Sequence, residues 1–383
     1  MTAMHAGGGE PDSLADRAAR MALSCVVDCG EPAVCDLVVD AGSEVAWAQV
    51  RGGAFGGPIA QRAAALELDV VLRRAEAAEV RFIVPGDGEW PPQLQDLRHC
   101  SPVNRRGGAP LGLWVRGPGH LAQLAERSVA VVGSRACTNY GSGVAADLGA
   151  DLALQGVTVI SGGAFGIDAS AHRGALAVQG PTVCVLANGV DIPYPAGNAA
   201  LLRWIAKEHV VVSELPPGAT PTRVRFLARN RVIAALSRGT VVVEAALRSG
   251  ARNTATWALE CNRHVMAVPG PVHSTMSAAP HLMIRDGLAN LVANAADVLD
   301  LVSDMGHHTL SVQQGETRPT DGMDPGRLAV FEAVPARGRA TAGEVALAAG
   351  VSLRACLADL VALEAAGFVA VDEIGWRLNA TKK

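Results

Sequence analysis

Short runs of apolar, often β-branched residues recur along the middle of the chain. They lie at 129–133, 157–161, 182–187, 209–215, 240–245 and 264–270. The stretches between them carry apolar residues at helical spacing and end in glycine or histidine. Strands that alternate with helices require parallel crossovers. The pattern therefore predicts an α/β fold built on a Rossmann-like, doubly wound, mostly parallel sheet.

The segments on either side of this region have different patterns. Residues 14–82 are rich in Ala, Leu and Val at helical spacing, interrupted by a glycine-rich segment at 52–57. A proline-rich connector follows and leads to a short strand at Leu113–Val115. Residues 304–325 are polar, rich in turn-forming residues and without periodicity, which is typical of a linker. We expect a helical (SAM-like) domain with its connector at 1–100, the Rossmann-like domain at 101–303 and the linker at 304–325.

The last 58 residues, 326–383, predict a winged-helix domain. Helical patterns at 327–334, 341–350 and 352–367 precede a β-ribbon pattern at 368–379, and three helices with a two-stranded wing form a winged helix-turn-helix. The expected recognition helix carries Arg354 but also Asp359 and Glu364. Because a helix that reads DNA is usually basic, a protein contact or a structural role is favoured over duplex binding, which stays the alternative.

Composition excludes several classes of protein. The chain has 383 residues, 49% hydrophobic and 18% charged, which suits two or three domains with sizeable cores. No apolar run approaches the roughly 20 residues of a membrane helix, and the first residues lack the pattern of a secretory signal. Cys25, Cys29 and Cys35 lie close together but lack a histidine complement at zinc-ligand spacing. We expect a cytoplasmic protein that lies outside membranes and binds no metal.

Seven arginines fall between residues 223 and 252, and Glu244 is the one acidic residue among them. The whole chain has a net charge of -4, so this cluster is a local excess of positive charge. A positive patch on an acidic protein favours a polyanionic partner. The arginines are Arg223, Arg225, Arg229, Arg231, Arg238, Arg248 and Arg252.

Three predicted strands end in turns that contain glycine or serine. They are Gly133-Ser134-Arg135, Ser161-Gly162-Gly163, and Ser249-Gly250 with Thr254 beyond it. Free backbone N–H groups at a helix N-terminus suit an anionic oxygen, and glycine lets a phosphate approach the backbone closely. Packing alone also explains a glycine in such a turn, but three turns in one sheet favour a phosphate-bearing ligand.

The familiar nucleotide cofactors do not fit these turns. The first turn is not GxGxxG, and the second strand ends in Ser-Gly-Gly without the acid that a nicotinamide site needs. A Walker A loop is excluded because no lysine precedes residue 207 or follows a later glycine loop. Asp168 and His172 could form an acid–base pair, yet without a nucleophile or second carboxylate a structural role is favoured. We expect no cofactor.

Eight motifs occur in order along this part of the chain. They are GSR (133–135), YG (140–141), SGGAFGIDASAH (161–172), GVDIPYPAGN (189–198), SELPPG (213–218), FLARNRVIAAL (226–236), VVEAALRSGARNTA (242–255) and AVPGPV (267–272). Together they resemble the DNA-processing protein A (DprA/Smf) family. The flanking helical domain and the terminal winged helix also resemble the three-part architecture of that family.

The resemblance implies a non-catalytic protein that binds single-stranded DNA, forms a homodimer and loads the RecA recombinase during natural transformation. The binding site expected from the motifs and the turns is Gly133, Ser134, Arg135, Ser161, Gly162, Gly163, Arg229, Asn230, Arg231, Ser249, Gly250, Arg252 and Thr254. The chain departs from the family at Ala196, where many relatives have lysine, and at Ala187-Asn188, where relatives often have glycine.

Three questions stay open at the level of sequence. A nucleotide phosphoribohydrolase-like enzyme is the alternative, since Thr254 to Glu260 resembles a TxxxxxE helix, although the PGGxGT motif of those enzymes is absent. The candidates for base stacking are Tyr140, Phe165, Tyr194 and Phe226. For dimerisation the candidate is the apolar segment 264–284, whose Met276, Leu282 and Met283 either form a surface or pack beneath the sheet.

Overall fold

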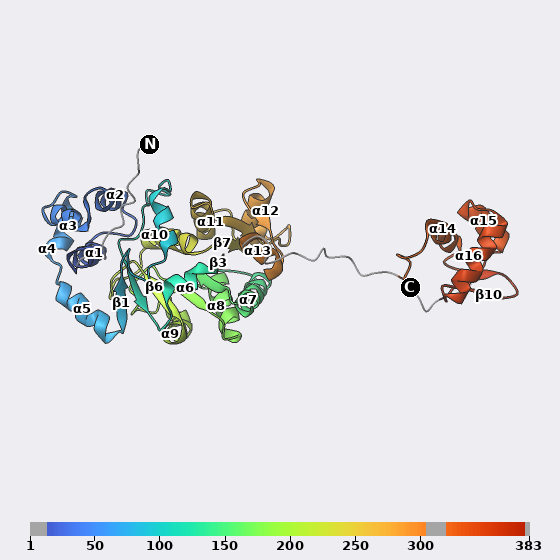
Figure 1. The fold of residues 1–383 in the computed structure, drawn as a ribbon, viewed down its shortest axis with the longest axis horizontal. Coiled ribbons are helices and arrows are strands. Elements are labelled where there is room, and N and C mark those ends of the chain that lie inside the picture. Colours follow the sequence, from blue (N-terminus) through green and yellow to red (C-terminus); the bar gives the residue numbers. More distant parts are fainter. Residues whose placement is uncertain (1–13, 304–318, 380–383) are drawn as a thin grey trace, which may run out of the picture. The chain divides into compact units, whose positions relative to one another are not determined.

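The centre of the chain is a nine-stranded sheet with strands in the order β1-β2-β6-β5-β4-β3-β7-β8-β9 (Figure 1). The computed structural model describes residues 14–303 and 319–379, and it divides into two units, Met1–Leu310 and Ser311–Lys383. The strands are β1 (Val80–Ile83), β2 (Leu113–Arg116), β3 (Ser128–Val132), β4 (Thr158–Ser161), β5 (Thr182–Val185), β6 (Val210–Ser213), β7 (Gly239–Val242), β8 (His264–Ala267) and β9 (Asn290–Leu291).

In the order of the sheet, all neighbours from β6 through β5, β4, β3, β7 and β8 to β9 are parallel. At one edge, β1 pairs with β2 and β2 pairs with β6, and both pairs are antiparallel. The six predicted apolar runs all form strands, which confirms the doubly wound, mostly parallel sheet. Val80–Ile83, which we expected at the end of the helical region, instead forms β1. Its Phe82 pairs with Trp114 of β2, and the two ring centroids are 4.7 Å apart. This cross-strand aromatic contact favours the strand over one more helical turn.

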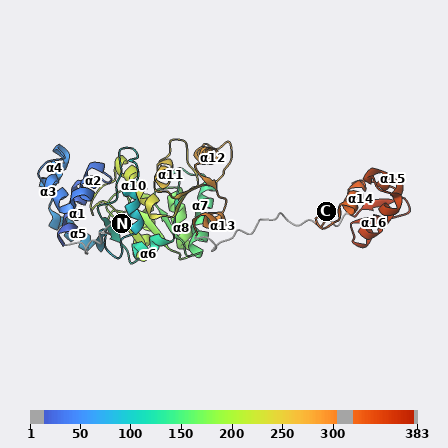
Figure 2. The ribbon, with the colours of Figure 1, turned by 45° about the horizontal axis from the view of Figure 1, so that its top comes forward.

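Helices cover both faces of the sheet, and alternate residues of β3 show why. Ala130 and Val132 lie in one apolar core with residues of α10 (Arg223–Leu236), α11 (Gly250–Glu260) and α12 (Ala278–Arg285). Val129 and Val131 lie in another with residues of α7 (Asn139–Leu154), α8 (Ile167–Ala177) and α13 (Ala295–Val302). A strand buried on both faces needs apolar residues at every position. The continuous valine-rich runs follow from this burial, and Figure 2 shows helices of the two groups, among them α10, α11, α7 and α8, beside the sheet.

The N-terminal helices form their own small core at the β1 end of the sheet. They are α1 (Leu14–Val26), α2 (Pro32–Ala41), α3 (Ser43–Arg51), α4 (Gly57–Ala64) and α5 (Leu68–Ala77). Leu23 and Val34 are fully buried there. The indole nitrogen of Trp114 in β2 donates a hydrogen bond to the Ser24 hydroxyl at 3.2 Å. These helices are therefore attached to the sheet through a buried polar contact as well as apolar packing, within one unit.

Strand order reverses at β3, which matters for ligand binding. From β3 the chain proceeds through β4 and β5 to β6 on one side, and then returns by α10 to β7 on the other side of β3. Two short helices, α6 (Leu121–Glu126) and α9 (Ala199–Glu208), lie before β3 and β6. In doubly wound sheets, ligands bind in the crevice beyond the carboxyl ends of the strands at this point of reversal. The fold thus indicates the β3–β7 edge as the place for a site.

The second unit has the expected order of elements. Helices α14 (Pro325–Ala333), α15 (Ala342–Ala349) and α16 (Leu353–Ala365) precede an antiparallel pair, β10 (Val369–Val371) and β11 (Trp376–Leu378). They share a core of their own that includes Val330, Leu360 and Trp376. The winged-helix assignment stays a prediction, and most of the predicted linker, residues 304–318, lies outside the described residues.

Within the described ranges, no single helix is long and apolar enough to cross a membrane. The bent pair formed by α15 and α16 meets that test by length and composition only. Some apolar side chains of this pair lie in the core of the second unit. Others, Leu353, Leu357 and Val361, form an exposed apolar stripe on α16.

Candidate functional site

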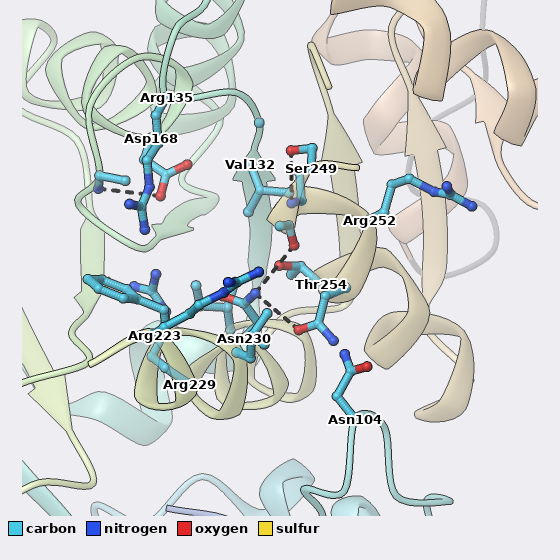
Figure 3. Close-up of a pocket in the computed structure, with 18 of the residues that line it drawn as sticks. Asn104, Val132, Arg135, Asp168, Arg223, Arg229, Asn230, Ser249, Arg252 and Thr254 are labelled. Carbon is cyan, nitrogen blue, oxygen red and sulfur yellow. Dashed lines mark hydrogen bonds between the residues drawn. The ribbon is translucent and has the colours of Figure 1, made fainter. Parts of the chain in front are cut away.

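A cavity of about 1020 Å³ opens at the carboxyl ends of β3 and β7, where the strand order reverses. Val132 and Gly133 at the end of β3 line its floor together with the segment from Leu247 to Thr254. One side of α10 forms a wall, and Asn104 reaches toward the cavity from a separate loop (Figure 3). Side chains from these four segments, together with Asp168 and Tyr194 from two others, meet at one crevice, which we call the switch-point pocket.

Eight of the thirteen predicted site residues line the switch-point pocket, and five do not. The eight are Gly133, Arg135, Arg229, Asn230, Ser249, Gly250, Arg252 and Thr254. The five that the structure places elsewhere are Ser134, Ser161, Gly162, Gly163 and Arg231. Ser134 lies in the turn after β3, where its hydroxyl accepts a hydrogen bond from the Ala136 N–H at 3.2 Å.

The Ser161-Gly162-Gly163 turn supports the pocket rather than lining it. The fully buried Ser161 hydroxyl donates to the Val131 carbonyl at 2.7 Å. A side chain at Gly162 would collide with the guanidinium of Arg229, and Gly163 has a positive φ of 66°. These glycines are needed for close packing and backbone conformation. The direct phosphate contact that we expected from this turn stays a prediction.

Arg231 lies on the opposite side of α10 from the pocket. Its side chain is fully buried and pairs with Glu214 at 2.6 Å. The loop at Gly30 packs against its guanidinium, so the pair joins α10 to the N-terminal helical domain. Successive residues of a helix point about 100° apart. Arg231 therefore points away from the pocket that its neighbour Asn230 lines, and its role is structural.

Arg229 is buried beneath the pocket and holds the ends of two strands together. Its Nη1 donates to the carbonyl of Gly162 at 2.8 Å and to that of Val185. Burial lowers the pKa of this guanidinium, and the nearby Asp168 acts in the opposite direction. Asp168 accepts the N–H groups of Gly162 and Ala164 at 3.1 and 3.4 Å, and burial raises the pKa of its carboxyl. The pair fixes the turn after β4.

Three other arginines of the pocket remain available to a ligand. Arg135, Arg223 and Arg248 are exposed, and within the described ranges none of them forms an ion pair. The guanidinium of Arg135 lies 4.6 Å from the ring centroid of Phe226, a cation–π distance that orients it over the pocket. Arg252 donates to the Leu247 carbonyl at 2.8 Å and extends away from the other labelled side chains (Figure 3).

The rest of the arginine cluster is dispersed by the fold. Arg225 pairs with Asp28 at 3.2 Å, and Arg238 donates to the Glu126 carbonyl outside the pocket. Glu244 is buried and accepts the backbone N–H and the hydroxyl of Thr138 at the start of α7. The one acid of the cluster is thus occupied at another helix terminus and does not neutralise the pocket.

Several polar and aromatic groups that we considered have structural partners. His172 is fully buried, its Nδ1 lies 2.7 Å from the Thr182 hydroxyl, and burial lowers its pKa to about 3. This agrees with a structural role.

Of the four aromatic candidates, Tyr194 and Phe226 line the pocket, with ring centroids 5.9 Å apart. Ala196 is exposed and does not line it, and the buried Asn188 closes its own turn by donating to Ile192.

Metal ligands and hydrolase residues are not grouped around this pocket. Across residues 14–303 and 319–379, no three His, Cys, Asp or Glu side chains are placed to hold a metal ion. Asp168 is the one carboxylate among the described residues that line the cavity. Glu260, which the hydrolase alternative requires, instead accepts the Ser101 N–H at 3.1 Å at the far end of α11.

Sequence reasoning missed Arg223, Arg248, Asn104 and Asn253 as residues of the site. Arg223 could have been found from helical spacing, since positions 223, 226, 230 and 233 of α10 share one face and all line the pocket. Asn104 could not be found from a local pattern, because it lies in the connector between β1 and β2.

Comparison with known proteins gives a consistent result. The family model described as DNA recombination-mediator protein A matches residues 81–303. The chain is 45% identical over 343 residues to the putative DNA processing protein DprA of Mycobacterium tuberculosis, and the match covers 86% of each. It is 39% identical over 214 residues to DprA of Streptococcus pneumoniae, which covers 54% of this chain and 73% of that protein.

Solved structures show the same fold. The X-ray structure of DNA processing protein A from Streptococcus pneumoniae has a TM-score of 0.62 and 29% identity, covering 76% of this chain and 99% of that one. DNA processing protein A from Helicobacter pylori, whose structure concerns its single-stranded DNA binding mode, has a TM-score of 0.50 and 24% identity, covering 58% and 94%.

Proposed function

Because the chain belongs to the DNA recombination-mediator protein A (DprA/Smf) family, we propose that it binds single-stranded DNA in the switch-point pocket. We further propose that it acts as a homodimer without catalysing a reaction, and that it loads the RecA recombinase onto incoming DNA during natural transformation. We also propose that it acts in the cytoplasm.

One observation supports DNA binding most strongly: three exposed arginines without ion-pair partners in the described structure surround one crevice. Arginine contacts to phosphate are charge-assisted and often bidentate, so each contributes both attraction and orientation. The N-terminus of α11 opens into the same crevice at Ser249 and Gly250, and a helix N-terminus attracts anions. A chain of phosphates suits this arrangement better than a single phosphate, because the cavity is at the upper end of the range for small-ligand sites.

Two features favour single strands over duplex DNA. Phe226 and Tyr194 offer aromatic faces beside the arginines, and base stacking requires bases that are free of a double helix. The expected recognition helix α16 carries the exposed apolar stripe of Leu353, Leu357 and Val361. Such a stripe suits a protein contact better than a phosphate backbone. The Helicobacter relative, studied for its single-stranded DNA binding, supports the same choice.

The homodimer is proposed on the surface that follows β8. In the predicted segment 264–284, Met283 is buried in the core, and Met276 and Leu282 are half-buried. Val272 and Leu291 nearby are exposed apolar side chains. Two pockets on one dimer would bind a single strand more tightly than one, through effective concentration.

The experiment for the whole proposal is a RecA-loading assay. Single-stranded DNA is first covered with a single-strand-binding protein, and RecA filament formation is then followed by its DNA-dependent ATPase activity. We expect the chain to shorten the lag before ATP hydrolysis, and Arg135→Ala to restore the lag. An unchanged lag with the wild-type chain would overturn the loading function. Release of free base from nucleoside monophosphates would support the hydrolase alternative instead.

A further inference from the structure

Beyond the arginines, the switch-point pocket contains a buried amide that lacks a partner. Asn253 of α11 lines the cavity and is 9% exposed. Its Nδ2 has no hydrogen-bond partner among the described residues. A buried donor without an acceptor is costly. A ligand that supplies an acceptor at this point would therefore gain binding free energy.

A chain of hydrogen bonds determines which way this amide faces. The Nδ2 of Asn230 lies 3.3 Å from the Gly250 carbonyl and 3.1 Å from Oδ1 of Asn253 (Figure 3). A backbone carbonyl can only accept, so Asn230 must present its NH₂ group there. Asn253 consequently turns its oxygen toward Asn230. Its own NH₂ group is left as a donor that the protein does not use.

The surroundings of this donor fit a nucleobase better than a phosphate. Arg135, Arg223 and Arg248 are exposed, which lets phosphates remain hydrated at the rim. Ile233 and Val132 are buried apolar side chains that line the same cavity as Asn253. A flat base can contact such walls while its polar edge meets one neutral donor.

We propose that Asn253 donates a hydrogen bond to a carbonyl oxygen of a base of the bound single strand, and so favours thymine over adenine. An asparagine that reads adenine uses its oxygen and its nitrogen together. Here the oxygen is occupied by Asn230, and the amide can only donate. Thymine offers carbonyl oxygens, whereas adenine accepts only at ring nitrogens, and its N7 acceptor stands beside an exocyclic donor that has no partner in this amide. This inference rests on the proposed binding of single-stranded DNA.

The test compares the affinities of the full-length chain for labelled (dT)20 and (dA)20 by fluorescence anisotropy. Asn253→Leu removes the donor in a similar volume, and Asn253→Asp keeps the oxygen that accepts from Asn230. We expect Asn253→Leu to weaken (dT)20 binding by roughly fivefold to tenfold. Binding of (dA)20 should change much less. Because (dA)20 stacks on itself, the quantity that decides is the change in the dT/dA ratio, not the ratio itself.

Arg248→Ala is the matched control, since a phosphate contact should weaken both oligonucleotides by the same factor and leave the ratio unchanged. Circular dichroism checks each variant, and if Asn253→Leu is unfolded, Asn253→Asp replaces it, with the same fall in the dT/dA ratio expected. The proposal is overturned if the variant leaves the ratio at the wild-type value. If the wild-type chain binds neither oligonucleotide, the proposed function itself fails.

Discussion

Replacement of Arg135 by alanine tests whether the switch-point pocket binds the phosphate backbone. Arg135 is exposed, lies in the turn after β3 and is held over the Phe226 ring at 4.6 Å. Little ordering is needed before it contacts a phosphate. A charge-assisted hydrogen bond contributes about 1.5–3 kcal/mol, so the loss should weaken single-strand binding roughly 10- to 150-fold. Arg135→Lys keeps the charge without the planar stack, and an intermediate loss is expected.

Two control variants remove the same charge elsewhere. Arg173→Ala removes an exposed arginine of α8 that does not line the pocket. Arg327→Ala lies in the second unit, where the arginine is 3.4 Å from Asp359. Affinities are measured by fluorescence anisotropy at one salt concentration, after circular dichroism has shown that every variant is folded. If Arg135→Ala and the controls lose affinity equally, the binding site lies elsewhere and the reasoning is refuted.

Three further predictions concern stability and assembly. Glu214→Gln leaves the buried Arg231 charge without its counter-ion, and urea unfolding should show a loss of about 3–5 kcal/mol; an unchanged midpoint would mean that the pair is not needed. His172 has a folded-state pKa of about 3 against an ordinary 6.5, so protons bind the unfolded chain first as pH falls below 6.5. Its contribution to the unfolding free energy should fall by about 1.4 kcal/mol per pH unit down to pH 3. His172→Gln should flatten that dependence, whereas equal pH slopes for both proteins would contradict it. The chain ending at residue 303 should sediment as a dimer and Leu291→Glu should weaken it; a folded wild-type monomer at tens of micromolar would remove the proposed interface.

The sheet could be predicted from the sequence because burial on both faces requires unbroken apolar runs, as in β3 and β7. β1 was missed because its four residues begin soon after α5 and its decisive contact is with Trp114, 32 positions away from Phe82. A tertiary contact of this kind leaves no local pattern. The same holds for Asn104, which the fold alone brings to the pocket.

The site could be predicted only in part, and α10 shows the reason. Arg229, Asn230 and Arg231 are adjacent in the sequence, but successive helical residues point about 100° apart. Asn230 and Arg229 both line the pocket, but Arg229 is buried and holds the carbonyl of Gly162, and Arg231 pairs with Glu214 away from the pocket. A cluster of charge in the sequence therefore indicates the element that contains a site, while burial and partners decide which of its residues are available.

The most direct measurement is the salt dependence of single-strand affinity for the wild-type chain and for a variant with Arg135, Arg223 and Arg248 all replaced by alanine. On single strands each phosphate contact contributes about -0.7 to the slope of log K against log salt. The variant should bind more weakly, with a slope shallower by about 2, and the wild type should bind blunt duplex less tightly than single strands. An unchanged slope in the folded variant, or tighter wild-type binding to the duplex, would contradict the assignment of single-stranded DNA to the switch-point pocket.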